Sequence, residues 1–217
     1  TDIDGNVYNT VTIGSQIWMK ENLKTTRYRN GDLIGTTSPA TLDISSQSNP
    51  KYQWAYNGNE SNVSTYGRLY TWYTVADSRG CCPYGWHLPN EADWTELTSY
   101  LGGESVAGGK LKEAGTIHWK SPNYGATNSS GFSALPGGYR GQDGLFCLVG
   151  DYGGWWSSEH TASGSAWTRS MYYLWSSTSN YSTSYNKGHG FSVRCVKGEI
   201  LNIPTVTTTS ISSITST

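Results

Sequence analysis

The largest concentration of side chains that could bind a ligand lies between residues 160 and 189. Of these 30 residues eight are Ser, four Thr, four Tyr, two Trp and two Asn, and only Arg169 and Lys187 carry a full charge. Tyr and Trp offer large rigid contacts, while Ser and Asn supply adaptable hydrogen bonds. The side chains expected to contact a ligand are Trp167, Arg169, Tyr172, Tyr173, Trp175, Asn180, Tyr181, Tyr185 and Asn186. The alternative is that the Trp side chains of this region build the core, as is favoured for the neighbouring pair Trp155 and Trp156.

A second pattern could hold a metal ion. Asp2, Asp4 and Asn6 alternate around Gly5, as oxygen ligands do in the first half of a calcium loop. No bidentate Glu follows at the spacing of an EF-hand, and the same alternation suits a tight turn. We therefore expect no required cofactor, and Ca²⁺ at these three residues is the one candidate ion.

Patterns of catalytic residues are incomplete. The stretch 103–110 is similar to a phosphate-binding loop, but its glycines are out of register and Lys110 is followed by Leu111 instead of Ser or Thr. The chain contains no G-x-S-x-G nucleophile motif, and its four His residues are scattered. We expect a protein that is not an enzyme.

The elements that must position these side chains follow from apolar periodicity. Residues 7–13 and 16–19 are β-prone. Four aromatic or apolar residues between 66 and 73 have helical spacing, which predicts a helix to about residue 76, with a strand as the alternative. Asn90 is a good N-cap for a second helix, and a shorter one is expected over 105–113. Short β-prone pieces follow from residue 132 onward. The expected fold class is α+β.

Composition excludes several classes of protein. Only 14% of the residues are charged and the net charge is −1, so there is no electrostatic basis for binding nucleic acid or an anionic membrane. No apolar run approaches the ~18 residues of a membrane span. The aromatic share of 13% comes from ten Trp and sixteen Tyr against three Phe, which is too rich for a disordered chain.

The four cysteines, at 81, 82, 147 and 195, bear on the compartment. An even number in a chain rich in Ser, Thr and Tyr suits oxidised cysteines in an exported protein, and the alternative is four reduced thiols in a cytosolic one. No C-x-x-C spacing indicates a zinc site. We expect a folded domain over 1–198, followed at 199–217 by a Thr/Ser-rich linker or the first strand of a β-sandwich domain, with a floppy terminus as the alternative.

Seven sequence blocks in order carry a family resemblance. They include DIDGNVYNTVTIGSQIWMKENLKTTRY at 2–28, CPYGWHLPNEADWTEL at 82–97 and GFSVRCVK at 190–197. Over residues 1–198 the chain resembles the Fibrobacter succinogenes major paralogous domain, a family similar to C-type lectin-like and formylglycine-generating-enzyme-like folds. The resemblance implies a C-type lectin-like fold with two main helices, short antiparallel strands and much irregular loop. It also implies a Cys82–Cys195 disulfide, which leaves Cys81 and Cys147 as a second pair; because Cys81 and Cys82 are adjacent, their assignment stays open.

Function transfers from the resemblance only in part. The motifs through which C-type lectins bind sugars with the help of calcium are missing from this sequence. Formylglycine-generating enzymes need two closely spaced cysteines near the C-terminus, and this chain has only Cys195 in that region. We expect an extracellular binding or adhesion module of a larger bacterial surface protein that recognises a glycan or a protein. The alternative is a structural or assembly module of a surface filament or layer without a soluble ligand. Neighbouring domains of the same chain are expected partners, whereas nucleic acid and membrane insertion are not.

Overall fold

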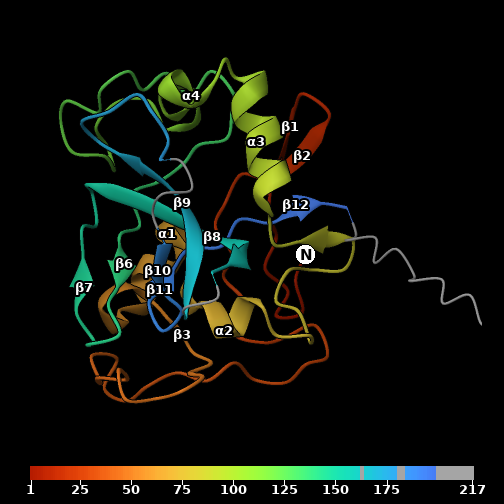
Figure 1. Cartoon of the computed structure of the whole chain (residues 1–217), viewed down its shortest axis with the longest axis vertical. Helices are drawn as coiled ribbons and strands as arrows, with labels where there is room; N and C mark the ends of the chain where they lie inside the picture. The colour runs from red at the N-terminus through yellow and green to blue at the C-terminus, as the bar shows by residue number, and fades with distance from the viewer. Residues whose placement is uncertain (162–163, 180–183, 199–217) are drawn as a thin grey trace, which may run out of the picture.

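The computed structural model describes residues 1–161, 164–179 and 184–198. Its strands form three antiparallel sheets (Figure 1). The four-stranded sheet has the order β1 (Thr10–Ile13), β2 (Gln16–Met19), β12 (Val196–Lys197) and β5 (Trp86–His87). The five-stranded sheet has the order β3 (Gln53–Trp54), β4 (Leu69–Thr71), β11 (Gly190–Phe191), β6 (Tyr139–Arg140) and β7 (Phe146–Cys147). The three-stranded sheet has the order β10 (Ser184–Asn186), β9 (Ser165–Tyr172) and β8 (Tyr152–His160).

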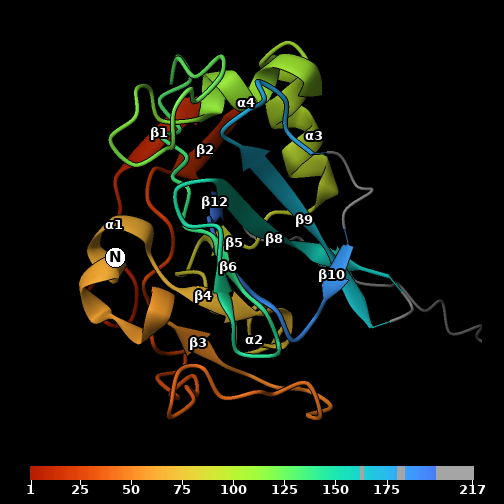
Figure 2. The same ribbon diagram turned by 90° about the vertical axis from the view of Figure 1, so that its left-hand side faces the viewer.

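The helices in the described residues are short. They are α1 (Val63–Tyr66), α2 (Trp72–Val75), α3 (Glu91–Tyr100) and α4 (Glu104–Leu111), with two 3-10 turns at Tyr56–Gly58 and Glu60–Asn62. Helices α3 and α4 lie together at one end of the molecule, and the long loop before β3 lies at the other (Figures 1 and 2). None of the described helices has the length and apolar character needed to cross a bilayer.

The predicted α+β, C-type lectin-like fold with two main helices is wrong, because the described residues are mostly β and the longest helix among them has 10 residues. The helix expected to about residue 76 is broken by β4. Gly67 adopts φ 72° and ends α1, after which Leu69, Tyr70 and Thr71 form a strand that is buried on both faces. A strand buried on both faces has no polar alternation, so its apolar run is easily mistaken for a helix.

The helix predicted at Asn90 is confirmed. The Asn90 side chain accepts from the backbone N–H of Asp93 at 2.9 Å, and the Asp93 carboxylate accepts from the backbone N–H of Asn90 at 2.9 Å. This reciprocal capping box satisfies two otherwise unpaired amides at the start of α3. The shorter helix is confirmed as α4, one or two residues earlier than expected at each end.

Strand β8 separates the two parts of the hydrophobic core. Trp155 packs among Trp18, Trp94 and Phe132 beneath α3, whereas Trp156 packs against Phe191 on the other side. Both rings are fully buried, and adjacent strand residues point to opposite faces. Each indole N–H is satisfied, that of Trp155 by the Asn22 side chain at 2.8 Å and that of Trp156 by the Tyr70 carbonyl at 2.7 Å. The paired tryptophans therefore belong to the core, as the sequence favoured.

Candidate ligand-binding site

The turn that follows β9 presents a cluster of aromatic rings. Met171 and Thr178 form an antiparallel bridge that closes the turn. The Tyr172 ring lies 4.8 Å from that of Tyr173 and 5.2 Å from that of Trp175, measured between centroids. Trp175 is 61% exposed, and the two tyrosines are half-buried. An exposed Trp beside Tyr rings offers a ready stacking surface.

Helix α4 lies beside this turn (Figure 2). The Gly109 N–H donates to the Ser176 carbonyl at 2.7 Å, and the Ser176 hydroxyl donates to the Ser105 carbonyl at 3.1 Å. A Cβ on Gly108 would lie 2.3 Å from the Ser177 carbonyl oxygen. The glycines of the stretch that is similar to a phosphate loop therefore let two backbones meet, which is a structural use of glycine.

A hollow of about 280 Å³ opens beside the rings, lined by Tyr152, Ser170, Tyr172, Trp175, Ser177 and Ser179. The strand register places Tyr152 directly opposite Tyr172 across the β8–β9 pair. The Tyr152 side chain is nine-tenths buried, and its hydroxyl lies beside the side chains of Ser170, Tyr185 and Thr168. Ser170 and Ser179 bond to each other through their hydroxyls at 2.8 Å. The hollow thus combines three aromatic side chains with several hydroxyls.

The charges near the hollow are already paired. Arg169 is 2% exposed and points to the other face of β9, where it forms an ion pair with Glu104 at 2.7 Å. At the rim Lys120 forms an ion pair with Asp151 at 2.9 Å, and the Asp151 carbonyl accepts from the Tyr173 N–H at 3.0 Å. No charged side chain among the described residues lines the hollow itself, so its chemistry is that of neutral hydrogen bonds and apolar contact.

The residues predicted from the sequence divide into separate groups. Tyr172, Tyr173 and Trp175 come together at the turn, whereas Arg169 is held inside by Glu104. The other predicted contacts that the structure describes are Trp167, half-buried on β9, Tyr185, packed 4.8 Å from Phe191, and Asn186, whose side chain accepts from the Gly188 N–H at 2.8 Å. Asn180 and Tyr181 lie outside the described residues.

Sequence reasoning missed Tyr152 and the three serines of the hollow. The sequence contained a signal for Tyr152. Gly164 lies between two β-prone runs, and a hairpin through it pairs the start of the first run, where Tyr152 lies, with the end of the second, where Tyr172 lies. The serines Ser170, Ser177 and Ser179 lie within the predicted segment, but nothing in their local sequence distinguishes them from its other hydroxyls.

The oxygens of the proposed calcium pattern are used by the protein itself. The Asp2 carboxylate accepts from the backbone N–H groups of Asp4 and Asn6 at 3.0 and 2.9 Å and from the Tyr8 hydroxyl at 2.6 Å. Asp4 accepts from the Thr26 N–H at 2.6 Å and lies 3.3 Å from Arg27. The alternation forms an Asx-type turn, and the part of the chain that the structure describes contains no cluster of three His, Cys, Asp or Glu side chains able to hold a metal.

The cysteines form one disulfide among the described residues. Cys82 and Cys195 are bonded, joining the segment before β5 to the segment before β12. The predicted second pair, Cys81 with Cys147, is wrong. Cys81 is buried in the core, where burial raises the pKa of its thiol to about 12, while Cys147 lies on β7 at the edge of the five-stranded sheet. The two free thiols therefore belong to separate elements.

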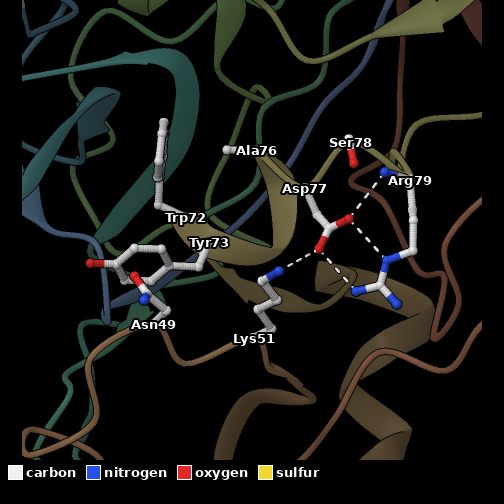
Figure 3. A pocket seen from close by; sticks show the side chains of 8 residues that line it. All are labelled: Asn49, Lys51, Trp72, Tyr73, Ala76, Asp77, Ser78 and Arg79. Atoms are coloured by element: carbon white, nitrogen blue, oxygen red, sulfur yellow. Dashed lines mark hydrogen bonds and ion pairs between the residues drawn. The ribbon is translucent and has the colours of Figure 1, made fainter.

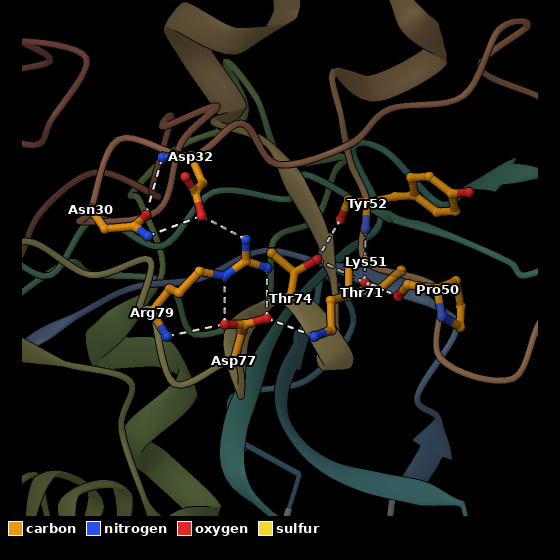
Figure 4. Close-up of polar contacts among 9 residues, drawn as sticks. All are labelled: Asn30, Asp32, Pro50, Lys51, Tyr52, Thr71, Thr74, Asp77 and Arg79. Carbon is orange, nitrogen blue, oxygen red and sulfur yellow. Dashed lines mark hydrogen bonds and ion pairs between the residues drawn. The ribbon is translucent and has the colours of Figure 1, made fainter.

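A larger hollow, of about 660 Å³, lies beside α2 and is lined by Trp72, Tyr73 and a group of polar side chains (Figure 3). Its charges are paired. The Asp77 carboxylate accepts from Lys51 at 2.7 Å and from Arg79 at 2.9 Å, and Arg79 also reaches Asp32 at 3.0 Å (Figure 4). These contacts hold the pKa of Asp77 well below its usual value, chiefly through the hydrogen bonds from Arg79.

Backbone contacts around the same hollow show what this network does. The Thr71 hydroxyl donates to the Pro50 carbonyl at 2.7 Å, and the Thr74 hydroxyl donates to the Tyr52 carbonyl at 3.2 Å (Figure 4). Together with the Asp77 ion pairs, these bonds tie the segment before β3 to α2. The hollow beside α2 therefore lies where two segments pack together, and its polar side chains hold those segments to each other. We take the hollow beside Trp175 as the candidate site.

Comparison with known proteins places the chain in a family. The family model described as the Fibrobacter succinogenes major domain matches residues 11–197, which cover the sheets except for the first residue of β1 and include the candidate site. No curated protein and no solved structure matches the chain. Because the family model covers most of the chain, this protein belongs to the Fibrobacter succinogenes major domain family.

Proposed function

We propose that this chain is a non-catalytic binding module that recognises a neutral glycan at the turn following β9. The observation that carries the proposal is the exposed Trp175 ring beside Tyr172, above a hollow lined by hydroxyls and free of charged side chains among the described residues. The apolar C–H faces of a sugar ring pack on aromatic side chains, and its hydroxyls need neutral donors and acceptors at the edge.

The hydroxyl groups of the hollow favour a polar ligand. The Ser170 and Ser179 hydroxyls bond to each other at 2.8 Å, and Tyr152 and Ser177 bring further hydroxyls to the same lining. A ligand hydroxyl seated in the hollow can exchange hydrogen bonds with these groups. An apolar peptide side chain in the same place offers them no hydrogen bond, so the hollow favours a sugar over an apolar side chain.

The cellular setting proposed here is the cell surface or the extracellular medium of a bacterium, as part of an adhesion protein. The Cys82–Cys195 disulfide supports this setting, because disulfides persist in oxidising compartments. The predicted Thr/Ser-rich connector at 199–217 lies outside the described residues. Binding through stacking and neutral hydrogen bonds also fits a chain with a net charge of −1.

The test is a binding titration of the full chain. The probes are maltohexaose, cellohexaose and mannohexaose as neutral oligosaccharides, with trigalacturonic acid as an acidic one, measured by calorimetry. We expect at least one neutral probe to bind, and Trp175→Ala and Tyr172→Ala each to weaken it about tenfold or more. Tyr84→Ala is the matched control, since Tyr84 is exposed but lies outside the hollow.

Two results would count against the proposal. If none of the neutral probes binds and a protein ligand does so through the same rings, the site is a protein-binding one. If a neutral probe binds with equal affinity to wild type, Trp175→Ala and Tyr172→Ala, the glycan site lies elsewhere on the molecule.

A further inference from the structure

Lys112 is a fully buried lysine that takes no part in the contact surface described above. It follows α4 directly, and its ammonium donates to the backbone carbonyls of Tyr124 at 3.0 Å, Tyr172 at 3.2 Å and Trp175 at 2.8 Å. No carboxylate among the described residues forms an ion pair with it, and its ammonium lies 5.4 Å from the centroid of the Trp119 ring. Three N–H groups thus meet three carbonyls.

The three carbonyls belong to the segments that shape the candidate site. Tyr172 and Trp175 flank the aromatic turn, and the Trp175 N–H donates to the Tyr172 carbonyl at 3.2 Å. Tyr124 belongs to a neighbouring loop, and its N–H donates to the Tyr173 carbonyl at 2.7 Å. One ammonium therefore holds both sides of the turn and the loop beside it.

A charge in this place is costly for folding. Burial lowers the pKa of Lys112, which means that the interior disfavours its charged form. A Met of similar length would fill the same volume without that cost. The hydrogen bonds that the ammonium donates to the Tyr124, Tyr172 and Trp175 carbonyls offset this cost, because hydrogen bonds from a charged donor are stronger than neutral ones.

We infer that Lys112 is the positioning residue of the candidate site, holding the turn at 172–175 in the conformation that presents Tyr172 and Trp175 to a ligand. This inference rests on the proposed function for its consequence in binding. Its consequence for the turn itself can be measured without any ligand. Removing the ammonium takes away the donor of the Tyr124 and Trp175 carbonyls and leaves the Tyr172 carbonyl with the Trp175 N–H alone. The turn keeps its hydrogen bonds to α4 through Ser176, and α3 and the β8–β9 pair keep their own.

The experiment compares Lys112→Met with wild type by amide hydrogen exchange and by calorimetry with the neutral oligosaccharide that binds wild type most tightly. We expect the Tyr124, Tyr173 and Trp175 amides to exchange about tenfold faster in the variant. We expect the affinity for the oligosaccharide to fall about tenfold, and the amides of α3 to keep their protection. Lys187→Met is the matched control, because Lys187 is also buried but packs 4.4 Å from Trp72 beside the other hollow.

The outcomes separate the two proposals. Unchanged exchange at the Tyr124, Tyr173 and Trp175 amides, or an equal acceleration of the α3 amides, overturns the role of Lys112. Faster exchange confined to the turn, with oligosaccharide affinity equal to that of wild type, overturns its role in presenting the rings. If the wild type binds no oligosaccharide but the turn amides of Lys112→Met exchange faster, the glycan proposal is overturned. The conclusion that Lys112 holds the turn is then still supported.

Discussion

Gly108→Ala tests whether α4 determines the position of the aromatic turn. The added Cβ would lie 2.3 Å from the Ser177 carbonyl oxygen and 2.8 Å from that of Ser176, closer than real contacts of this kind come. Both obstacles are backbone atoms, so a side-chain rotation cannot relieve the clash. The turn must move away from α4, and the 2.7 Å hydrogen bond from the Gly109 N–H to Ser176 must lengthen with it.

Two opposing terms set the size of the effect. Replacing Gly by Ala inside a helix gains about 1 kcal/mol of helix propensity. Overpacking against fixed neighbours costs about 1–3 kcal/mol. Lengthening the hydrogen bond from the Gly109 N–H to Ser176 costs up to about 1 kcal/mol more, because part of that bond's stabilisation is lost. The net loss lies between about 0 and 3 kcal/mol, and its middle value of about 1.5 kcal/mol lowers the melting temperature of a chain of this size by roughly 3–6 °C.

The assay is thermal unfolding followed by circular dichroism, with oligosaccharide affinity as the second measurement. Val106→Ala is the control on the exposed face of the same helix, where helix propensity changes without a new contact to the turn. We expect Gly108→Ala to melt earlier and to bind more weakly, with Val106→Ala close to wild type in affinity. An increase in the melting temperature of Gly108→Ala would show that the turn yields freely and would refute the reasoning.

Three further predictions concern stability. Non-reducing peptide mapping should recover a Cys82–Cys195 crosslink and two free thiols. Replacing Cys82 and Cys195 by Ala should lower the free energy of unfolding by about 4–5 kcal/mol in the chain-entropy model for a loop of 113 residues. A crosslink through Cys81 would contradict the assignment. His87 hydrogen bonds through one ring nitrogen to Asp93 at 3.0 Å and through the other to the Gly198 carbonyl at 2.7 Å, and the Asp93 contact raises its pKa. That stabilisation is complete below the unfolded pKa of about 6.5 and is lost as the pH rises through the higher folded pKa. The free energy of unfolding measured by chemical denaturation should therefore decline above pH 6.5, and Asp93→Asn should remove this decline. An equal decline in the variant would assign it to another group. Because protein donors already occupy the Asp2 carboxylate, EDTA should leave the melting temperature unchanged, and a drop restored by Ca²⁺ would show a calcium site.

Local sequence was sufficient for several features. The capping box at Asn90 and Asp93 needs only residues three apart, so the start of α3 is predictable. The aromatic turn is equally local, because Tyr172, Tyr173 and Trp175 lie within four consecutive positions and meet through a short bend. The Cys82–Cys195 bond links residues 113 positions apart and was predictable only through the family resemblance.

Long-range contacts decided the rest. Arg169 lies in a segment whose composition is typical of a contact surface. Its position on β9, however, points its side chain toward Glu104 on α4, 65 residues earlier in the chain. Strand β4 has apolar spacing that suits a helix, and only pairing with β3 and β11 makes it a strand. Likewise nothing near Lys112 in the sequence indicates that carbonyls 12, 60 and 63 residues away converge on its ammonium.

The sequence by itself determined which chemistry is available to this protein, namely aromatic rings and neutral hydroxyls in one segment with little charge. The tertiary structure decided which of those side chains share a surface. Composition and short-range periodicity follow from neighbouring residues, whereas the hollow beside Trp175 exists because β8 places Tyr152 opposite Tyr172 and because Lys112 holds the turn after β9. Those arrangements depend on hydrogen bonds between distant segments, which no local pattern encodes.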